Sequence, residues 1–551
     1  MTARSRGVTA RPRAPARAAS RGERLAAAAP WAIVALAVIL VLAMRVRLMD
    51  LPLERDEGEY AYAGQMILEG HVPYGDMDNM KLPGTYYAYA LFMALLGQSP
   101  RGIHFGLALW TTVSALLLFA VGRRLLDPLA GAIAAAVFAI LSASFSVLGF
   151  AGHATHFVVL PVLAGCWGIL WPGRRERLGL LAAGLAFGLA FLMKQQAAAF
   201  VLFGVLFVLW RSRSAGWRSA ALKGLLFSLG AAAPYAVLCA YLASKGVFAN
   251  FWFWTVTYAR DYVGEVPITD AGAIFLDQAG EVTGWYAGAW ALAAAGAIVY
   301  FIRGKDRDTK VFLAGLTILS FAAVCPGFFF REHYFIVMLP AVGLLTGAGY
   351  AALPSGRAGG EGPGWTRALY AIACFAALLA GGVAQAAPVF KWDMEHVSRR
   401  CYGINPFPES IEIGRYIDAN SAPADRIAVL GSEPEIYFYA HRRSASRYLY
   451  VYALMEPHPY AGRLQDQVIE EIEAARPRIV VLVRVGVSWL GRPDSDKRIM
   501  RWMDSYLPAH YDVTGLAQMS RNNSTRYLWG PEAAAAAGDS HDDVLVMKRR
   551  D

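Results

Sequence analysis

Charged residues are scarce in this 551-residue sequence: they make up 17% of it, whereas hydrophobic residues make up 56%. A soluble protein usually carries about a quarter charged residues, so the composition excludes an ordinary soluble protein. The apolar residues also fall in long blocks, near or above the ~18 residues that cross a bilayer. The sequence therefore predicts a polytopic membrane protein.

Cysteine is scarce as well, with five residues, four of them in apolar blocks and Cys401 alone beyond them. This spacing predicts no disulfide framework. The net charge of +10 is not spread over the chain, because residues 1–28 hold seven arginines and one glutamate. The charge therefore indicates membrane orientation, and no nucleic-acid partner is expected.

Apolar blocks predict eleven spans, at about 29–48, 103–122, 129–149, 153–171, 178–193, 197–210, 220–243, 285–303, 311–327, 333–352 and 366–387. The polar run Lys194-Gln195-Gln196 separates two short spans. A twelfth block, 84–97, has only fourteen residues, so we expect it to be interfacial or re-entrant.

Loop charge sets the predicted orientation. With eleven spans, most basic loop residues lie on the same side as the arginine-rich N-terminus, which the positive-inside rule makes cytoplasmic. We expect a basic cytoplasmic tail (1–28), a transmembrane domain (29–387) with outer connections at 50–102 and 244–284, and an extracytoplasmic domain (388–551). The expected location is the cell (inner or plasma) membrane.

The C-terminal 388–551 segment is richer in charge and alternates short strands with helices. Arg426–Leu430, Arg478–Val483 and Val544–Lys548 predict strands, and Leu464–Ala475 predicts a helix. Residues 532–543 are expected to be a flexible insertion. A small α/β domain fits this pattern.

The first outer connection holds the densest cluster of reactive side chains. Residues 54–62 read Glu-Arg-Asp-Glu-Gly-Glu-Tyr-Ala-Tyr, and a Pro-Tyr pair, Asp76, Asp78 and Lys81 follow. A partly desolvated carboxylate at a bilayer edge can have a raised pKa and act as a base. The alternative is a solvated loop whose acids face water.

The order of these residues is familiar. Arg-Asp-Glu-x-x-Tyr from Arg55, Gly-x-x-Pro-Tyr-x-Asp ending at Asp76, and Lys-x-Pro from Lys81 resemble the first extracytoplasmic loop of bacterial GT-C glycosyltransferases. More narrowly, the chain looks like the branch related to protein O-mannosyltransferases and lipid A aminoarabinose transferases. Met193-Lys194-Gln195 and His333-Tyr334-Phe335 extend the resemblance over about residues 30–350.

This resemblance implies an all-α polytopic GT-C fold of about 11 transmembrane helices with an extracytoplasmic α/β domain. It implies a transferase that moves a sugar from a polyprenyl-phosphate carrier to an extracytoplasmic lipid, glycan or protein. Asp56 matches the catalytic aspartate, which would deprotonate the acceptor hydroxyl in an inverting displacement. Glu57 would support Asp56 or its loop.

The phosphate leaving group needs positive charge around it. The candidates are Lys81, which matches the family's loop lysine, then Lys194 and Arg331. Each has an alternative role: Lys81 would snorkel to the interface, Lys194 would cap a broken helix, and Arg331 would pair with Glu332.

Further residues are expected to line the substrate cavity, namely Tyr60, Tyr62, Asp76, His153, His156 and His333. The family often has an acidic residue where this chain has His153 and His156. The two histidines could line the cavity, bind zinc with an unidentified third ligand, or pack against aromatic rings. No cofactor is expected to be required; the alternative is a divalent cation on the Asp76–Asp78 pair.

The aromatic run Asn250–Tyr258 predicts an interfacial belt, or else a contact with the lipid carrier or sugar. Two other functions compete with glycosyl transfer. A transporter or flippase of lipid-linked sugars would place charged residues at mid-membrane, whereas here they cluster in loops and span ends. A non-catalytic envelope-assembly protein would not need Asp56.

Overall fold

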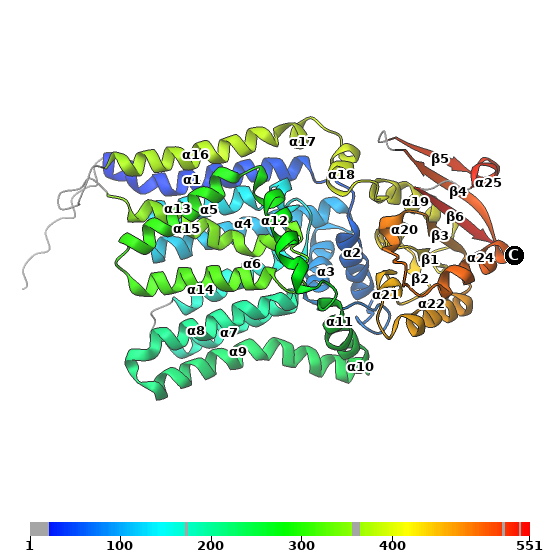
Figure 1. Ribbon diagram of the computed structural model, residues 1–551, viewed down its shortest axis with the longest axis horizontal. Helices are drawn as coiled ribbons and strands as arrows, with labels where there is room; N and C mark the ends of the chain where they lie inside the picture. The colour runs from blue at the N-terminus through cyan, green and yellow to red at the C-terminus, as the bar shows by residue number, and fades with distance from the viewer. Residues whose placement is uncertain (1–20, 171–174, 355–363, 521–523, 539–541, 551) are drawn as a thin grey trace, which may run out of the picture.

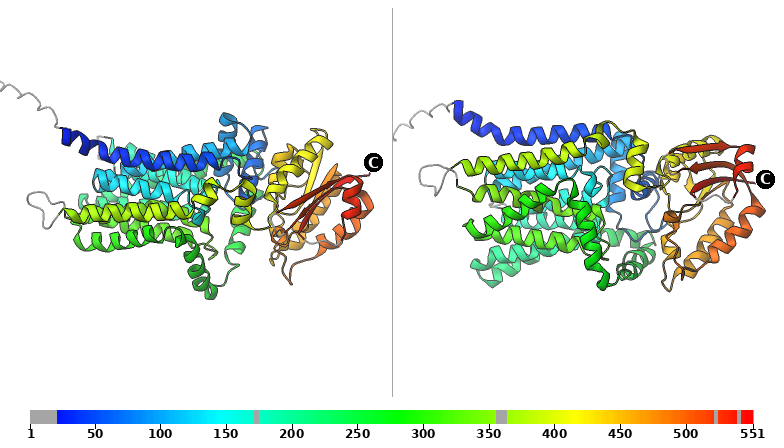
Figure 2. Two further views of the ribbon diagram at one scale, coloured as in Figure 1. Left: turned by 90° about the horizontal axis from the view of Figure 1, so that it is seen from above. Right: turned by 45° about the horizontal axis from the view of Figure 1, so that its top comes forward.

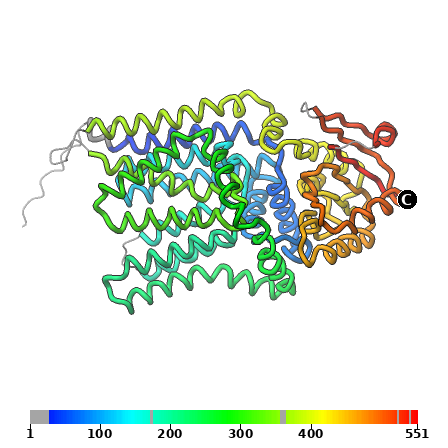
Figure 3. The backbone as a smooth tube through the Cα atoms, viewed as in Figure 1, coloured from blue at the N-terminus to red at the C-terminus, as the bar shows by residue number. Residues whose placement is uncertain are grey.

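The computed structural model describes residues 21–170, 175–354, 364–520, 524–538 and 542–550. A bundle of long helices forms the larger part, and a smaller α/β domain lies at one end of it (Figure 1). Helix α1 begins at the opposite end of the bundle. The same arrangement is visible from two other directions (Figure 2), and the course of the chain can be followed in Figure 3.

Every predicted span coincides with a bundle helix: α1 (Arg21–Arg47), α4 (Pro100–Leu125), α5 (Pro128–Leu141), α6 (Ala154–Ile169), α7 (Glu176–Met193), α8 (Ala198–Ser212), α9 (Trp217–Ser244), α13 (Ala287–Arg303), α14 (Arg307–Val324), α15 (Leu339–Ala352) and α16 (Trp365–Ala384). Within the described residues, seven helices are long and apolar enough to cross a membrane, or eight if a pair bent by 106° is one span. The chain is thus a multi-pass membrane protein, and the count of eleven stays a prediction.

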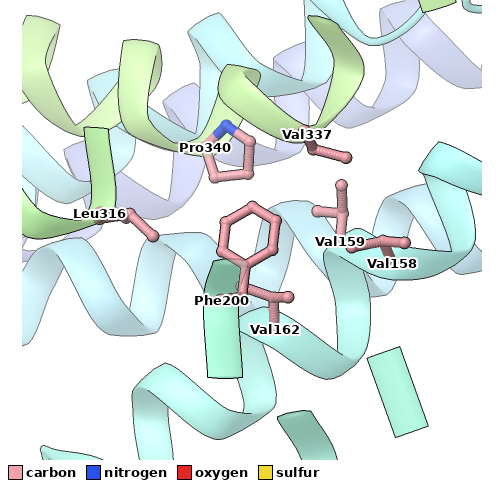
Figure 4. A pocket seen from close by; sticks show the side chains of 7 residues that line it. All are labelled: Val158, Val159, Val162, Phe200, Leu316, Val337 and Pro340. Atoms are coloured by element: carbon pink, nitrogen blue, oxygen red, sulfur yellow. The ribbon is translucent and has the colours of Figure 1, made fainter. Parts of the chain in front are cut away.

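Small and apolar residues let the bundle helices pack closely. A Cβ at Gly184 of α7 would lie 2.0 Å from the carbonyl oxygen of Phe227 in α9, so only glycine fits there. Between α6, α8, α14 and α15 the packing leaves a cavity of about 10 Å³. All seven side chains around it are apolar (Figure 4), so it offers water no partner.

Two arginines, Arg45 and Arg47, lie in the last turn of α1, where the predicted orientation expects few basic residues, and both have partners in the structure. Arg45 is 4% exposed and donates to the carbonyl oxygens of Ser142 (3.0 Å) and Gly149 (2.9 Å). Arg47 donates to the carbonyl oxygen of Trp392 (2.7 Å). Both residues hold the outer end of the bundle together.

Short helices lie between the bundle and the C-terminal domain (Figure 1). The predicted interfacial block is helix α3, of 13 residues. The second outer connection includes a π-helix, η4, which opens the helical turn across part of its aromatic run. These elements are α2 (Arg55–Leu68), α3 (Gly84–Leu96), α10 (Phe248–Trp252), η4 (Phe253–Tyr258), α11 (Ala259–Val263) and α12 (Ile268–Gly284).

The C-terminal domain is built on a six-stranded sheet of order β2-β1-β3-β6-β4-β5. Strand β1 pairs in parallel with β2 and β3, and the remaining pairs are antiparallel. The strands are β1 (Arg426–Leu430), β2 (Arg443–Ser444), β3 (Ile479–Val483), β4 (Tyr511–Met519), β5 (Thr525–Trp529) and β6 (Asp543–Arg549).

The helices of this part are α17 (Ala386–Phe390), α18 (Met394–Tyr402), α19 (Phe407–Asn420), α20 (Glu435–Ala440), α21 (Tyr452–Met455), α22 (Ala461–Ala475), α23 (Gly486–Trp489), α24 (Arg498–His510) and α25 (Pro531–Ala536). The three predicted strands and the predicted helix are confirmed within a few residues. The flexible insertion at 532–543 is wrong for its first half, because a proline followed by alanines starts α25. Residues 539–541 lie outside the described residues.

Candidate active site

A cavity of about 820 Å³ lies where the bundle meets the C-terminal domain. We call it the outer cavity. Its wall combines the first outer connection, the start of α6, the break between α7 and α8, the second outer connection, the 3-10 helix η5 (Glu332–Met338) and the C-terminal domain. Segments hundreds of residues apart therefore share one chamber.

The start of helix α2 presents two acidic residues of the motif, Glu54 and Asp56, to this cavity. Glu54 is its N-cap, with an extended backbone and a side chain that accepts from the backbone N–H of Glu57 (2.9 Å). Acidic side chains in the first turn suit the positive end of a helix. Asp56 lies in that turn, and its side chain is 27% exposed.

Lys81 joins two carboxylates of α2. Its Nζ lies 2.7 Å from Asp56 Oδ1 and 2.5 Å from Glu59 Oε2, and 4.7 Å from the centre of the Tyr60 ring. Tyr86 donates a further hydrogen bond to Glu59. Burial favours the neutral form of Lys81, but the two carboxylates outweigh it and raise its pKa. Lys81 is therefore a cation whose charge is already balanced.

The charge on Asp56 follows from the same contacts. Burial raises the pKa of its carboxyl group, but Lys81 and His153 outweigh burial and hold that pKa well below its usual range. Glu54 behaves differently: burial and the charge of Asp56 raise its pKa to about 7. Of these two carboxyl groups, Asp56 is therefore the more readily ionised.

Lys194 and Arg331 are the cavity cations without an acidic partner among the described residues. Lys194 follows the last residue of α7, and its Nζ lies 4.0 Å from the centre of the Tyr334 ring. Burial lowers its pKa to about 7; the charge of Asp56 acts against this shift, and the charges of Lys81 and Arg331 add to it. The described residues show no ion pair between Arg331 and Glu332; the Arg331 guanidinium lies 5.4 Å from the Phe329 ring instead.

His153 and His333 reach the cavity from two different helices. His153 is 2% exposed, and its Nδ1 lies 3.6 Å from Glu54 and 3.9 Å from Asp56. Its ring stacks on His333 at 4.1 Å. Burial lowers the pKa of His153, but Glu54 and Asp56 outweigh it, and the pKa is raised.

These two histidines and Asp56 could hold a metal ion. One ligand atom from each lies within 4.8 Å of the others, and this ligand set suits zinc. The stacked rings would have to rotate, because imidazole lone pairs lie in the ring planes. His156, the other histidine of the zinc hypothesis, is not in this cluster and does not line the cavity.

Several predicted residues lie behind the cavity or outside it. Glu57 is fully buried and accepts from the backbone N–H of Gly152 (2.5 Å), with His104 Nε2 at 3.1 Å, so it holds the turn before His153. Two expected cavity residues, Tyr62 and Asp76, do not line it. Tyr62 accepts from a backbone N–H of the C-terminal domain, and Asp76 contacts His71 at 2.8 Å near the surface.

The Asp76–Asp78 pair is split, because Asp76 lies in a bend whereas Asp78 forms an isolated β-bridge with Tyr448 of the C-terminal domain. Asp78 is buried, lines the cavity and accepts a hydrogen bond from Asn250. The aromatic run is split in the same way: Trp254 and Tyr258 line the cavity, while Trp252 is exposed.

The C-terminal domain supplies contacts that the sequence did not indicate. Arg55 donates to Asn405 (2.8 Å), to the carbonyl oxygen of Ser432 (2.5 Å) and to Glu433 (2.9 Å). Tyr450 reaches Asp56 Oδ1 at 3.2 Å. Glu59 could have been found from the sequence, since it lies three residues after Asp56 on one helix, but no local signal marks Tyr450.

The comparisons with known proteins agree with this geometry. The family described as dolichyl-phosphate-mannose-protein mannosyltransferase matches residues 80–238. The undecaprenyl phosphate-alpha-4-amino-4-deoxy-L-arabinose arabinosyl transferase of Pseudomonas aeruginosa (strain UCBPP-PA14) is 30% identical over 232 residues. That match spans 38% of this chain and 40% of the relative's length.

Two solved structures share the fold over nearly the whole chain. ArnT from Cupriavidus metallidurans bound to undecaprenyl phosphate has a TM-score of 0.55 at 15% identity, covering 93% of this chain and 97% of that one. The archaeal oligosaccharyltransferase AglB from Archaeoglobus fulgidus has a TM-score of 0.52 at 14% identity, covering 92% and 75%. The chain thus has the GT-C fold with a C-terminal sheet domain, and its resemblance to the protein mannosyltransferase and aminoarabinose transferase branch is confirmed.

Proposed function

We propose that this protein is a glycosyltransferase that moves a sugar from a polyprenyl-phosphate carrier to an extracytoplasmic acceptor. The observation that carries the proposal is a carboxylate whose pKa is held low, Asp56, in a large cavity that Lys194 and Arg331 also line, neither of which forms an ion pair within the part of the chain that the structure describes. The arabinosyl transferase relatives and the ArnT complex with undecaprenyl phosphate support a lipid-phosphate donor.

The reaction is a single displacement. The acceptor hydroxyl oxygen forms a bond to the anomeric carbon, its proton passes to Asp56, and the bond from that carbon to the carrier phosphate breaks with its electron pair leaving on the phosphate. The hydroxyl becomes more acidic as the new bond forms, so a carboxylate of low pKa suffices. All groups used belong to the chain, and we propose no required cofactor.

Lys194 and Arg331 are the phosphate-binding residues of this proposal. Lys81 ranked first from the sequence, but its ammonium group is already shared between Asp56 and Glu59. A phosphate would have to compete with two carboxylates for Lys81, whereas Lys194 and Arg331 form no ion pair with any described carboxylate. Lys81 then serves to hold Asp56 ionised and in place.

The proposed orientation puts the outer cavity outside the cytoplasm. The α8–α9 and α13–α14 connections lie at the end of the bundle away from the cavity (Figure 1) and carry Arg211, Arg213, Arg218, Lys305 and Arg307. By the positive-inside rule this end is cytoplasmic. We propose a cytoplasmic N-terminus, a transmembrane domain at 29–387 and an extracytoplasmic domain at 388–551, in the cell membrane.

Deletion of the gene in its host tests the proposal. Envelope glycans, glycolipids and glycoproteins of the deleted and restored strains would be compared by mass spectrometry. Loss of one sugar from one class of molecule is expected, and its mass would give the class of that sugar. If the protein were a transporter of lipid-linked sugars, its deletion would instead remove every product made from that donor. If it were an assembly protein, its deletion would change no sugar.

A further inference from the structure

Tyr450 brings a hydroxyl group from the C-terminal domain to the catalytic carboxylate. Its Oη lies 3.2 Å from Asp56 Oδ1 and 3.0 Å from the carbonyl oxygen of Arg55, and Lys81 Nζ lies 3.4 Å from it as a donor. A tyrosine hydroxyl has one proton to donate, and a carboxylate is a stronger acceptor than a carbonyl. The expected recipient of that proton is therefore Asp56.

The position of this hydroxyl is fixed from both sides. Val451, the next residue, donates its backbone N–H to Ser432 Oγ (3.1 Å), and the Ser432 carbonyl accepts from Arg55 (2.5 Å). On the other side, the backbone N–H of Asp78 donates to the carbonyl oxygen of Arg447 (2.8 Å). The segment that carries Tyr450 is thus bonded to two separate parts of the first outer connection, near Arg55 and at Asp78.

The two oxygens of Asp56 have different surroundings. Oδ1 accepts hydrogen bonds from both Lys81 and Tyr450, whereas His153 Nδ1 lies 3.9 Å from Oδ2, beyond hydrogen-bond distance. We propose that Tyr450 is a positioning residue: with Lys81 it fixes Oδ1 and leaves Oδ2 as the oxygen that takes the acceptor proton. This inference rests on the proposed role of Asp56 as base, and it makes the C-terminal domain part of the active site.

Carbodiimide labelling tests the contact without a known substrate. A water-soluble carbodiimide reacts with protonated carboxyl groups. The purified full-length protein is labelled across a range of pH, and mass spectrometry measures how much of the Asp56 peptide is labelled. The midpoint of this curve gives the pH at which Asp56 protonates. A hydrogen bond to a charged group stabilises the charged form of that group, here the Asp56 carboxylate. Because Tyr450→Phe removes this hydrogen bond, it should raise the labelling midpoint by about one pH unit. The other charged or titratable groups facing Asp56 stay unchanged: Glu54, Glu59, Lys81, His153, Lys194, Arg331 and His333.

Tyr416→Phe is the matched control. It also removes one hydroxyl that donates over 3.2 Å, to the carbonyl oxygen of Thr514, in the same domain but outside the cavity. Its labelling midpoint should equal that of the wild type. In a second variant, Tyr450 is replaced by 3-fluorotyrosine, whose hydroxyl is a stronger donor, and the labelling midpoint should fall. This variant keeps the proposal testable if the Tyr450→Phe protein does not fold.

The same variants are then expressed in the deletion strain. Tyr450→Phe should restore the missing sugar more slowly than wild type, with the largest deficit at acidic pH, and Tyr416→Phe should restore it fully. Unchanged labelling midpoints for both Tyr450 variants would overturn the proposal, whatever the glycan result. If the labelling midpoints shift as expected but the deletion strain lacks no sugar, the contact between Tyr450 and Asp56 stands and the glycosyltransferase assignment is refuted.

Discussion

Replacing Gly58 with alanine should loosen the contact between the C-terminal domain and α2. A Cβ at this position would lie 2.6 Å from both Cβ and the backbone N of Glu435, and 2.8 Å from its Cα. Carbon atoms in ordinary contact are about 3.5–4.0 Å apart, so α2 and α20 would have to separate by roughly 1 Å. The atoms in the way are rigid, because two of them are backbone and the third is a Cβ.

The cost can be estimated from these contacts. Overpacking typically costs about 1–3 kcal/mol, and a clash with backbone belongs at the upper end. Alanine is favoured over glycine within a helix by about 1 kcal/mol, which leaves a net loss of about 2 kcal/mol. For a domain of this size, such a loss lowers the midpoint of thermal unfolding by about 4–8 °C.

The assay is thermal unfolding of the full-length protein in detergent, followed by tryptophan fluorescence, with limited proteolysis to detect release of the C-terminal domain. Gly272→Ala is the control, because Gly272 lies within helix α12 with no atom near its would-be Cβ. That change should leave the midpoint unchanged or raise it. Equal midpoints for Gly58→Ala and wild type would refute the reasoning about this interface.

Two further predictions concern charge. Lys194→Gln and Arg331→Gln should each weaken binding of undecaprenyl phosphate to the purified protein about tenfold or more, as expected for a lost charged contact. Lys223→Gln is the control, since it removes a lysine that is paired with Glu176, and it should not change this affinity. Equal affinities for all three variants and wild type would refute the phosphate assignment. Burial raises the pKa of Asp78 from 3.8 to about 6, so the folded state holds this proton more tightly, and stability is lost as pH rises through about 6. At pH 7.5, Asp78→Asn should therefore be more stable than wild type by about 3 kcal/mol and should unfold at a higher temperature. This difference in stability should vanish as pH falls from 6 to 4. A difference in stability that does not depend on pH would contradict the prediction.

The bundle helices were predictable because hydropathy and length are properties of the local sequence. The same holds for the break at Lys194 and for three of the strands. The order of the sheet was not predictable, since β6 inserts between β3 and β4 through contacts far apart in the chain. Helix α25 is not predicted, because a run of alanines is typical of low-complexity segments, although alanine is also the best helix former.

The candidate site was predictable where a motif or a helical spacing marks it. Asp56, Lys81, Lys194, His153, Arg331 and His333 all line the outer cavity. The pairing of Lys81 with Glu59 was missed because it depends on α2 beginning at Arg55, which puts Glu59 beside Asp56. Tyr450 is 394 residues from Asp56, and only the docking of the C-terminal domain brings them together.

The central claim is that Asp56 is the base of a sugar transfer. Its most direct test is to restore the deletion strain with Asp56→Asn at an expression level equal to wild type and to measure the missing sugar by mass spectrometry. Asparagine keeps the size of the side chain and removes the carboxylate that takes the proton, so the account predicts that wild type restores the sugar and Asp56→Asn does not. Full restoration by Asp56→Asn would contradict it.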